Sequence, residues 1–127
     1  MLSYAATTDA VRVTVRPVWI EGQSDPLAAR FAFAYFVEVA NESDEEVQIL
    51  RRHWRIRHAD GRVEEVEGEG VVGVKPVIAP GASHAYHSFC VLSTFTGTME
   101  GTYLVERPSG ARFRIAIPRF DLVAGMN

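Results

Sequence analysis

The sequence predicts an all-β protein in which two antiparallel sheets pack face to face. Three observations support this prediction. Apolar and polar residues alternate with a period of two over most of the chain, a helical period of 3.6 persists nowhere, and turn signals recur roughly every 8–15 residues. We therefore expect an antiparallel β-sandwich of the immunoglobulin or fibronectin type III kind, with about seven or eight strands.

The composition is that of an ordinary globular chain. With 47% hydrophobic and 23% charged residues, the 127 residues argue against disorder and favour one domain spanning residues 1–127, with flexible tails over 1–9 and 123–127. The net charge of −3 argues against general affinity for nucleic acid.

The sequence also bears on where the protein works. Its first residues lack the basic region and apolar run of a signal peptide, and no apolar stretch is long enough to span a membrane. Cys90 is the single cysteine, so no internal disulfide can form. A reducing, cytoplasmic location without membrane insertion is therefore expected.

Two strands are predicted in the first third of the chain. Valines alternate with polar residues over 11–16, which predicts a strand that ends near Pro17, and breaker residues over 20–28 predict a loop. Large and small residues alternate over 31–40, which predicts a central strand, and residues 41–44 carry turn chemistry.

A β-hairpin is predicted in the middle of the chain. The apolar residues of the strand over 47–57 change phase near Leu50, which a β-bulge at 50–52 would explain. Asp60-Gly61 is a hairpin turn signal and would pair this strand with residues 62–67; a two-residue loop would place Arg57 opposite Glu64. Cross-strand ion pairs are expected between two groups: Arg51, Arg52, Arg55 and Arg57, and Glu64, Glu65, Glu67 and Glu69.

Three more strands follow a glycine-rich stretch that runs from Gly68 to Gly81. The alternating segments over 83–92, 99–106 and 112–117 are separated by a loop over 93–97 and by the turn residues Pro108, Ser109 and Gly110. In the last pair of strands, Tyr103 and Val105 are expected opposite Phe113, Ile115 and Ile117.

Gly68, Gly70 and Gly73 have the G-x-G-x-x-G spacing of dinucleotide-binding loops. That function requires a helix after the glycines, and a β-branched, proline-containing run follows instead. We favour a structural interpretation, in which the glycines allow a tight path for an edge strand between the sheets. A backbone nest beside Lys75 that holds an anion without a helix is the alternative.

The sequence gives only weak evidence for metal-binding or catalytic residues. His84, His87 and Cys90 have a suggestive spacing, but successive side chains of a strand point to opposite faces, so the three cannot converge. His53 and His58 could join them only through a chance tertiary contact. Neither a nucleophile elbow nor a convincing Cys–His pair is present. We expect no enzyme activity, no metal site and no cofactor.

Several blocks in a fixed order resemble the ApaG family. They are R-H-W-R-I at 52–56, G-E-G-V-V-G-V-K-P at 68–76, P-G at 80–81, Y-H-S at 86–88, M-E-G-T-Y at 99–103 and I-P-R-F at 117–120. The family more often has proline after Thr94, where this chain has Phe95, and this departure concerns only the shape of that loop.

The resemblance implies a fibronectin type III-like sandwich, found alone in bacteria and as a domain in larger eukaryotic proteins, that acts as a protein–protein interaction module. It also implies an association with cobalt and magnesium efflux, which assigns no residue a role and which we expect to be indirect. We therefore expect a non-enzymatic module that binds an unknown protein partner; pairing of two copies through strand edges is also open. The alternative is an anion or nucleotide sensor of the pyrophosphate-binding type. Both functions use the same candidate residues: Gly68, Gly70, Gly73, Lys75 and Pro76.

Overall fold

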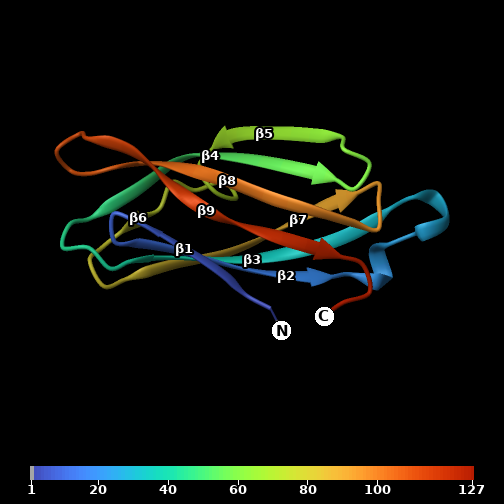
Figure 1. The fold of residues 1–127 in the computed structure, drawn as a ribbon. Coiled ribbons are helices and arrows are strands. Elements are labelled where there is room, and N and C mark those ends of the chain that lie inside the picture. The colour runs from blue at the N-terminus through green and yellow to red at the C-terminus, as the bar shows by residue number, and fades with distance from the viewer. Residues whose placement is uncertain (1) are drawn as a thin grey trace.

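The computed structural model describes residues 2–127 and consists of two antiparallel sheets packed face to face (Figure 1). One sheet has four strands in the order β1-β2-β3-β7; the other has the order β5-β4-β8-β9, with β6 also paired to β4. The strands are β1 (Tyr4–Thr8), β2 (Val11–Trp19), β3 (Phe31–Asn41), β4 (Val47–His58), β5 (Val63–Glu69), β6 (Val77–Ile78), β7 (Ser83–Leu92), β8 (Thr96–Glu106) and β9 (Arg112–Val123). The predicted antiparallel sandwich is confirmed.

The nine strands exceed the seven or eight that were expected. The two-residue β6 was not predicted, and residues 4–8 form β1 where the sequence suggested a flexible tail. Asp9 and Ala10 both have positive φ, 48° and 61°, as in a type I′ hairpin turn. Alanine rarely adopts this conformation, so the turn carries no sequence signal.

The second expected tail, residues 123–127, also makes contacts with the sandwich. Val123 is the last residue of β9, Ala124 is buried, and the Ala124 N–H donates to the carbonyl of Phe95. The Asn127 amide bonds to both backbone groups of Trp19, at 2.7 Å and 3.2 Å. Both ends of the described chain are therefore attached to the fold.

Two prolines lie inside strands, against the prediction that β2 ends near Pro17. Pro17 pairs with Tyr35 in β3, but β1 ends opposite Val15, so β2 is an edge strand at Pro17 and tolerates the missing N–H. Pro118 extends β9 beyond the predicted residue 117. It lies at a bulge, because Ile117 pairs with Gly101 whereas Phe120 pairs with Met99.

The predicted hairpin of β4 and β5 forms with a different register. The bulge near Leu50 is confirmed by a register shift between Ile49 and Arg51. The turn is longer than two residues, because the His58 N–H bonds to the carbonyl of Arg62. Arg57 is therefore opposite Val63 rather than Glu64, and the charged residues that face each other are Arg55 with Glu65 and Arg51 with Glu69.

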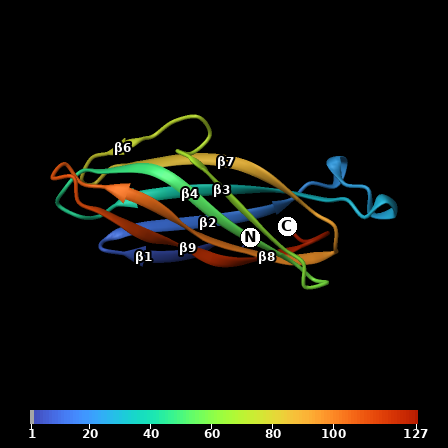
Figure 2. The same ribbon diagram turned by 90° about the horizontal axis from the view of Figure 1, so that it is seen from above.

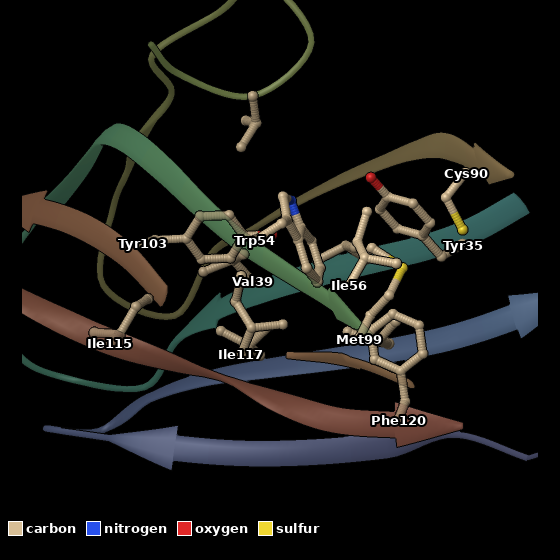
Figure 3. Close-up of a cluster of buried hydrophobic side chains, with 14 of the residues drawn as sticks. Tyr35, Val39, Trp54, Ile56, Cys90, Met99, Tyr103, Ile115, Ile117 and Phe120 are labelled. Atoms are coloured by element: carbon tan, nitrogen blue, oxygen red, sulfur yellow. The ribbon is translucent and has the colours of Figure 1, made fainter. Parts of the chain in front are cut away.

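The core lies between the two sheets and includes a group of aromatic rings. Phe120 from β9 has its ring centroid 6.1 Å from that of Tyr4, 6.2 Å from that of Tyr35 and 6.0 Å from that of Trp54. In Figure 3 the labelled Trp54, Met99 and Phe120 side chains all point into the space between the sheets. Strands from both sheets contribute, so the core fixes how the two layers sit together.

The remaining secondary structure is short. Two 3-10 helices of three residues each, η1 (Glu21–Gln23) and η2 (Pro26–Ala28), lie between β2 and β3. Across residues 2–127, no helix has the length and apolar character needed to cross a membrane.

Candidate functional site

The five predicted site residues lie in one continuous segment, which begins at the end of β5 with Gly68 and then passes along β4. We call residues 68–76 the glycine loop. Gly68 is paired with Arg52 of β4, and the Arg52 guanidinium fills the space that a Cβ on Gly68 would enter. Arg52 also donates from Nη1 to the carbonyls of Glu69 and Gly70, at 2.9 Å and 3.1 Å. Arg52 thus fixes the start of the loop.

A tight turn forms the tip of the glycine loop. The Val71 N–H donates to the carbonyl of Val74 at 2.8 Å, and the Val74 N–H donates back to Val71 at 3.2 Å. Val72 and Gly73 between them both have positive φ, 46° and 80°, as in a type I′ turn. Gly70 has φ +61°, and a Cβ there would lie 2.2 Å from the Val74 carbonyl oxygen. Glycine is therefore required at 70 for the loop to close.

Val72 is strained and exposed. A β-branched residue rarely adopts the left-handed conformation, which costs of order 1–3 kcal/mol when the surroundings impose it. The Val72 side chain is 62% exposed, and its neighbour Val74 is also exposed, whereas Val71 is fully buried. Val71 therefore anchors the turn in the core while Val72 is held out in solvent.

The end of the glycine loop is attached to β4. Ile49 donates its N–H to the carbonyl of Pro76 at 3.0 Å, and the Gln48 side chain donates to the carbonyl of Lys75 at 3.2 Å. The Lys75 ammonium lies 2.6 Å from a Glu69 carboxylate oxygen, and Arg51 pairs with the same carboxylate. These contacts, the Lys75 hydrogen bond above all, lower the pKa of Glu69.

These contacts occupy several groups of the loop that could otherwise bind an anion. The N–H groups of Gly70, Val71 and Val74 already donate to carbonyls of the chain. The nearby cations Lys75 and Arg51 are engaged by Glu69, and a two-residue strand follows the loop where a phosphate-binding helix would be needed. Gly70 and Gly73 supply positive φ along the path of the loop.

A family model described as the ApaG domain matches residues 21–107, which include the whole glycine loop. The chain belongs to the ApaG family. Proteins named Protein ApaG from Brucella suis and from Methylobacterium sp. are 46% and 47% identical over 119 residues, which make up 94% of this chain and 92% of each relative.

Two solved structures resemble this chain. A putative ApaA protein from Bordetella pertussis has a TM-score of 0.89 at 39% identity, covering 92% of this chain and 95% of its own. A protein from Archaeoglobus fulgidus with 9% identity has a TM-score of 0.55, covering 89% of this chain and 97% of its own, and shows a likeness of fold alone.

The predicted metal candidates of this ApaG domain do not come together. On β7, the exposed His87 packs between Phe36 and Phe89, and its ring centroid lies 5.4 Å and 5.7 Å from theirs. His84 and Cys90 lie on the inner face of the same strand, as the alternation predicted. Within residues 2–127, no group of three or more His, Cys, Asp or Glu side chains is arranged to hold a metal ion.

A buried histidine network escaped the sequence reasoning. The ring of His58 is fully buried; its Nε2 lies 2.6 Å from Glu64, and its Nδ1 accepts the Ser93 N–H at 3.1 Å. Nε2 therefore carries the proton and donates to the carboxylate. The Ser93 hydroxyl is also 3.1 Å from Nδ1, so serine and carboxylate contact the two ring nitrogens in the reverse of the arrangement in a serine-protease triad. The Ser93 N–H already donates to Nδ1, and the ring is buried. We therefore interpret these hydrogen bonds as a structural link between the β4–β5 hairpin and the β7–β8 connection.

A pocket of about 360 Å³ lies where the two ends of the chain meet. Its walls are mostly apolar, and Asp121 and Asn127 are the polar exceptions. The lining residues are Leu2, Tyr4, Pro17, Val18, Trp19, Phe33, Asp121, Val123, Met126 and Asn127. None of the residues in the glycine loop reaches this pocket.

Proposed function

We propose that this ApaG domain is a non-enzymatic binding module that engages a protein partner through the glycine loop. The observation that supports the proposal most strongly is Val72, a strained valine held in solvent at the tip of an anchored turn. Strained backbone of this kind clusters at functional sites. An exposed apolar side chain on a fixed backbone is what a partner's pocket can recognise.

The anchoring of the loop favours binding. Hydrogen bonds from Arg52, Gln48 and Ile49 fix its backbone at both ends, and buried Val71 fixes its tip. A loop that is already ordered loses little conformational entropy when it binds, so more of the contact energy appears as affinity.

The surroundings of the tip resemble a small interface. Val72, Val74 and Val77 are exposed apolar residues, and the ion pairs of Glu69 with Lys75 and Arg51 lie beside them. An apolar centre with a polar rim is the usual anatomy of protein–protein contacts. We propose that the partner offers an apolar pocket for valine with polar groups around it.

Changing Val72 to Asn should separate binding from stability. Asparagine tolerates positive φ, so Val72→Asn is expected to raise the free energy of unfolding by about 1 kcal/mol, measured by urea denaturation. It should also remove the apolar contact, so that proteins captured from native cell extract by the immobilised wild-type domain are lost.

The matched control is Leu27→Asn, which changes a fully exposed apolar residue in η2. This variant should capture the same proteins as the wild-type domain. Retention of the captured proteins by Val72→Asn would contradict a role for the tip of the loop.

Anion or nucleotide sensing by Gly68, Gly70 and Gly73 is the alternative function. We expect it to fail because the N–H groups of Gly70, Val71 and Val74 are already used. Titration with pyrophosphate and with ATP, followed by amide chemical shifts, is expected to leave residues 68–75 unchanged at ligand concentrations up to about 100 μM, which corresponds to a binding free energy of about 5.5 kcal/mol. Shifts confined to these residues would favour the sensor.

The other expectations remain proposals of the same kind. We propose that any link to cobalt or magnesium efflux is indirect, because the family's association with efflux assigns no residue of this chain a role. A cytoplasmic location stays a prediction from the single cysteine. Pairing of two copies through a strand edge is a second interaction that we propose.

A further inference from the structure

The two sheets together present four outer strands: β1 and β7 in one sheet, and β5 and β9 in the other. The free backbone groups of an outer strand can pair with another chain. Proteins commonly prevent this with short strands, charges, prolines or bulges. The four strands can therefore be compared by how well each is protected.

Three of the four are protected. β1 has only five residues, and its Thr8 hydroxyl accepts the Ala116 N–H of β9 at 3.1 Å. β5 carries Glu64, Glu65, Glu67 and Glu69 within seven residues. β9 contains Pro118 at a bulge, together with Arg112, Arg114 and Arg119.

β7 lacks every one of these protections. It is ten residues long, contains no Lys, Arg, Asp, Glu or Pro, and pairs only with β3 among the strands of residues 2–127. Its outward face is Ala85, His87, Phe89 and Val91, of which Phe89 is 57% and Val91 42% exposed. In Figure 2 it runs along the outer side of its sheet.

We propose that the β7 edge pairs with β7 of a second copy of this chain, antiparallel and around a two-fold axis. Such pairing joins the two four-stranded sheets into one continuous sheet. A strand that pairs antiparallel with its own copy faces the same set of side chains, so a strand whose charges are mostly of one sign would meet like charges. β7 avoids that penalty, as does the short β1, whereas the four glutamates of β5 and the three arginines of β9 would repel their copies.

The side chains of β7 suit self-pairing around Ser88. Alternation requires outward residues to meet outward residues, so the two-fold axis must pass through a residue position. With Ser88 on the axis, Ala85 lies opposite Val91 and His87 lies opposite Phe89, which matches a small residue with a larger one and an aromatic ring with another. Within one chain, His87 and Phe89 already pack edge to face, with interplanar angle 89°.

The expected dimer is weak. One strand pair with its flanking side chains buries less surface than a standard interface of about 1,600 Å². We therefore expect a dissociation constant in the range of about 10–100 μM. The association would be missed at low concentration.

Sedimentation equilibrium from about 1 μM to about 1 mM tests the proposal. The wild-type mass should rise with concentration from 14.1 kDa toward twice that value. Phe89→Lys places a charge on the exposed edge and should weaken association at least about tenfold. The matched control is Phe95→Lys, because Phe95 lies outside β7 and is equally exposed, at 57%; it should associate as the wild type does.

Two results would overturn the proposal. One is a wild-type chain that stays monomeric over the whole range, and the other is a dimer that persists in Phe89→Lys. The proposal is independent of the glycine loop, because Val72→Asn should dimerise like the wild type while losing partner capture. Failure of one function therefore leaves the other testable. Far-UV circular dichroism of both lysine variants should match the wild type, which separates lost association from lost fold.

Discussion

Replacing Gly101 with alanine is expected to lower the free energy of unfolding by about 3 kcal/mol, at the upper end of the usual cost of overpacking. Gly101 of β8 is paired with Trp54 of β4. A Cβ on Gly101 would lie 2.0 Å from the carbonyl oxygen of His53 and 3.2 Å from the Trp54 Cα. These are backbone atoms of a central strand, so they cannot move aside without disturbing the hydrogen bonds between β4 and β8.

Urea denaturation at neutral pH measures this loss, and Gly22→Ala is the control. Gly22 lies in η1, where a Cβ would meet no atom within 4 Å and φ is not positive. Gly22→Ala should leave the free energy of unfolding within about 0.5 kcal/mol of the wild type or raise it slightly. A similar small change in Gly101→Ala would show that β8 can separate from β4 without cost.

Raising the pH above about 9 is expected to destabilise the domain steeply. Burial raises the pKa of Tyr35, Tyr86 and Tyr103, and it raises the pKa of Cys90 to about 12. The unfolded chain loses these protons near the ordinary values of 9.0 for cysteine and 10.0 for tyrosine, whereas the folded chain holds them to higher pH. Stability is therefore complete below the unfolded values and falls as pH rises toward the folded ones.

The size of this destabilisation is given by the slope of the free energy of unfolding against pH. Each group that is protonated when folded and ionised when unfolded removes about 1.4 kcal/mol of stability per pH unit. Urea denaturation at about pH 8, 9, 10 and 11 should show the loss, and it should be less steep in Tyr86→Phe and in Tyr103→Phe because phenylalanine has no proton to lose. The slopes are compared rather than the absolute stabilities, since either change also removes the hydrogen bond between the two hydroxyls. Equal slopes in wild type and variants would refute the explanation.

Strands with one buried face could be predicted from the sequence. In β7, and in β3 beyond Tyr35, buried and more exposed side chains alternate, so the period of two is visible, and the bounds of β7 were predicted as Ser83–Leu92. The phase change near Leu50 correctly indicated a bulge because a bulge exchanges the faces of a strand.

The errors occur where a local signal and a tertiary contact disagree. Pro17 and Pro118 usually end strands, but an unpaired edge and a bulge accommodate them. Asp60-Gly61 indicated a two-residue loop, while the bond between His58 and Arg62 makes the loop longer. Asp9 and Ala10 carry no hairpin signal, so β1 was assigned to a tail.

The sequence indicated where the candidate site lies in the chain, but it did not predict the geometry of the site. The unusual density of glycine and proline indicated a constrained loop, and Gly70 does require its positive φ. The strain at Val72 could not be foreseen, because valine is the wrong residue for a left-handed turn. His58, Glu64 and Ser93 could not be grouped either, since Ser93 lies 35 residues beyond His58 and only the packed sheets bring them together.

The pocket that Leu2 and Asn127 share has a consequence for how this fold can be combined with other proteins. Both ends of the described chain emerge side by side, whereas β5 runs along the opposite side of the sandwich (Figure 1). A domain whose ends adjoin can be inserted into a surface loop of a host protein, or circularly permuted with a short linker, without stretching either sheet. In such a fusion we expect the two proposed binding surfaces, the glycine loop and the β7 edge, to remain accessible.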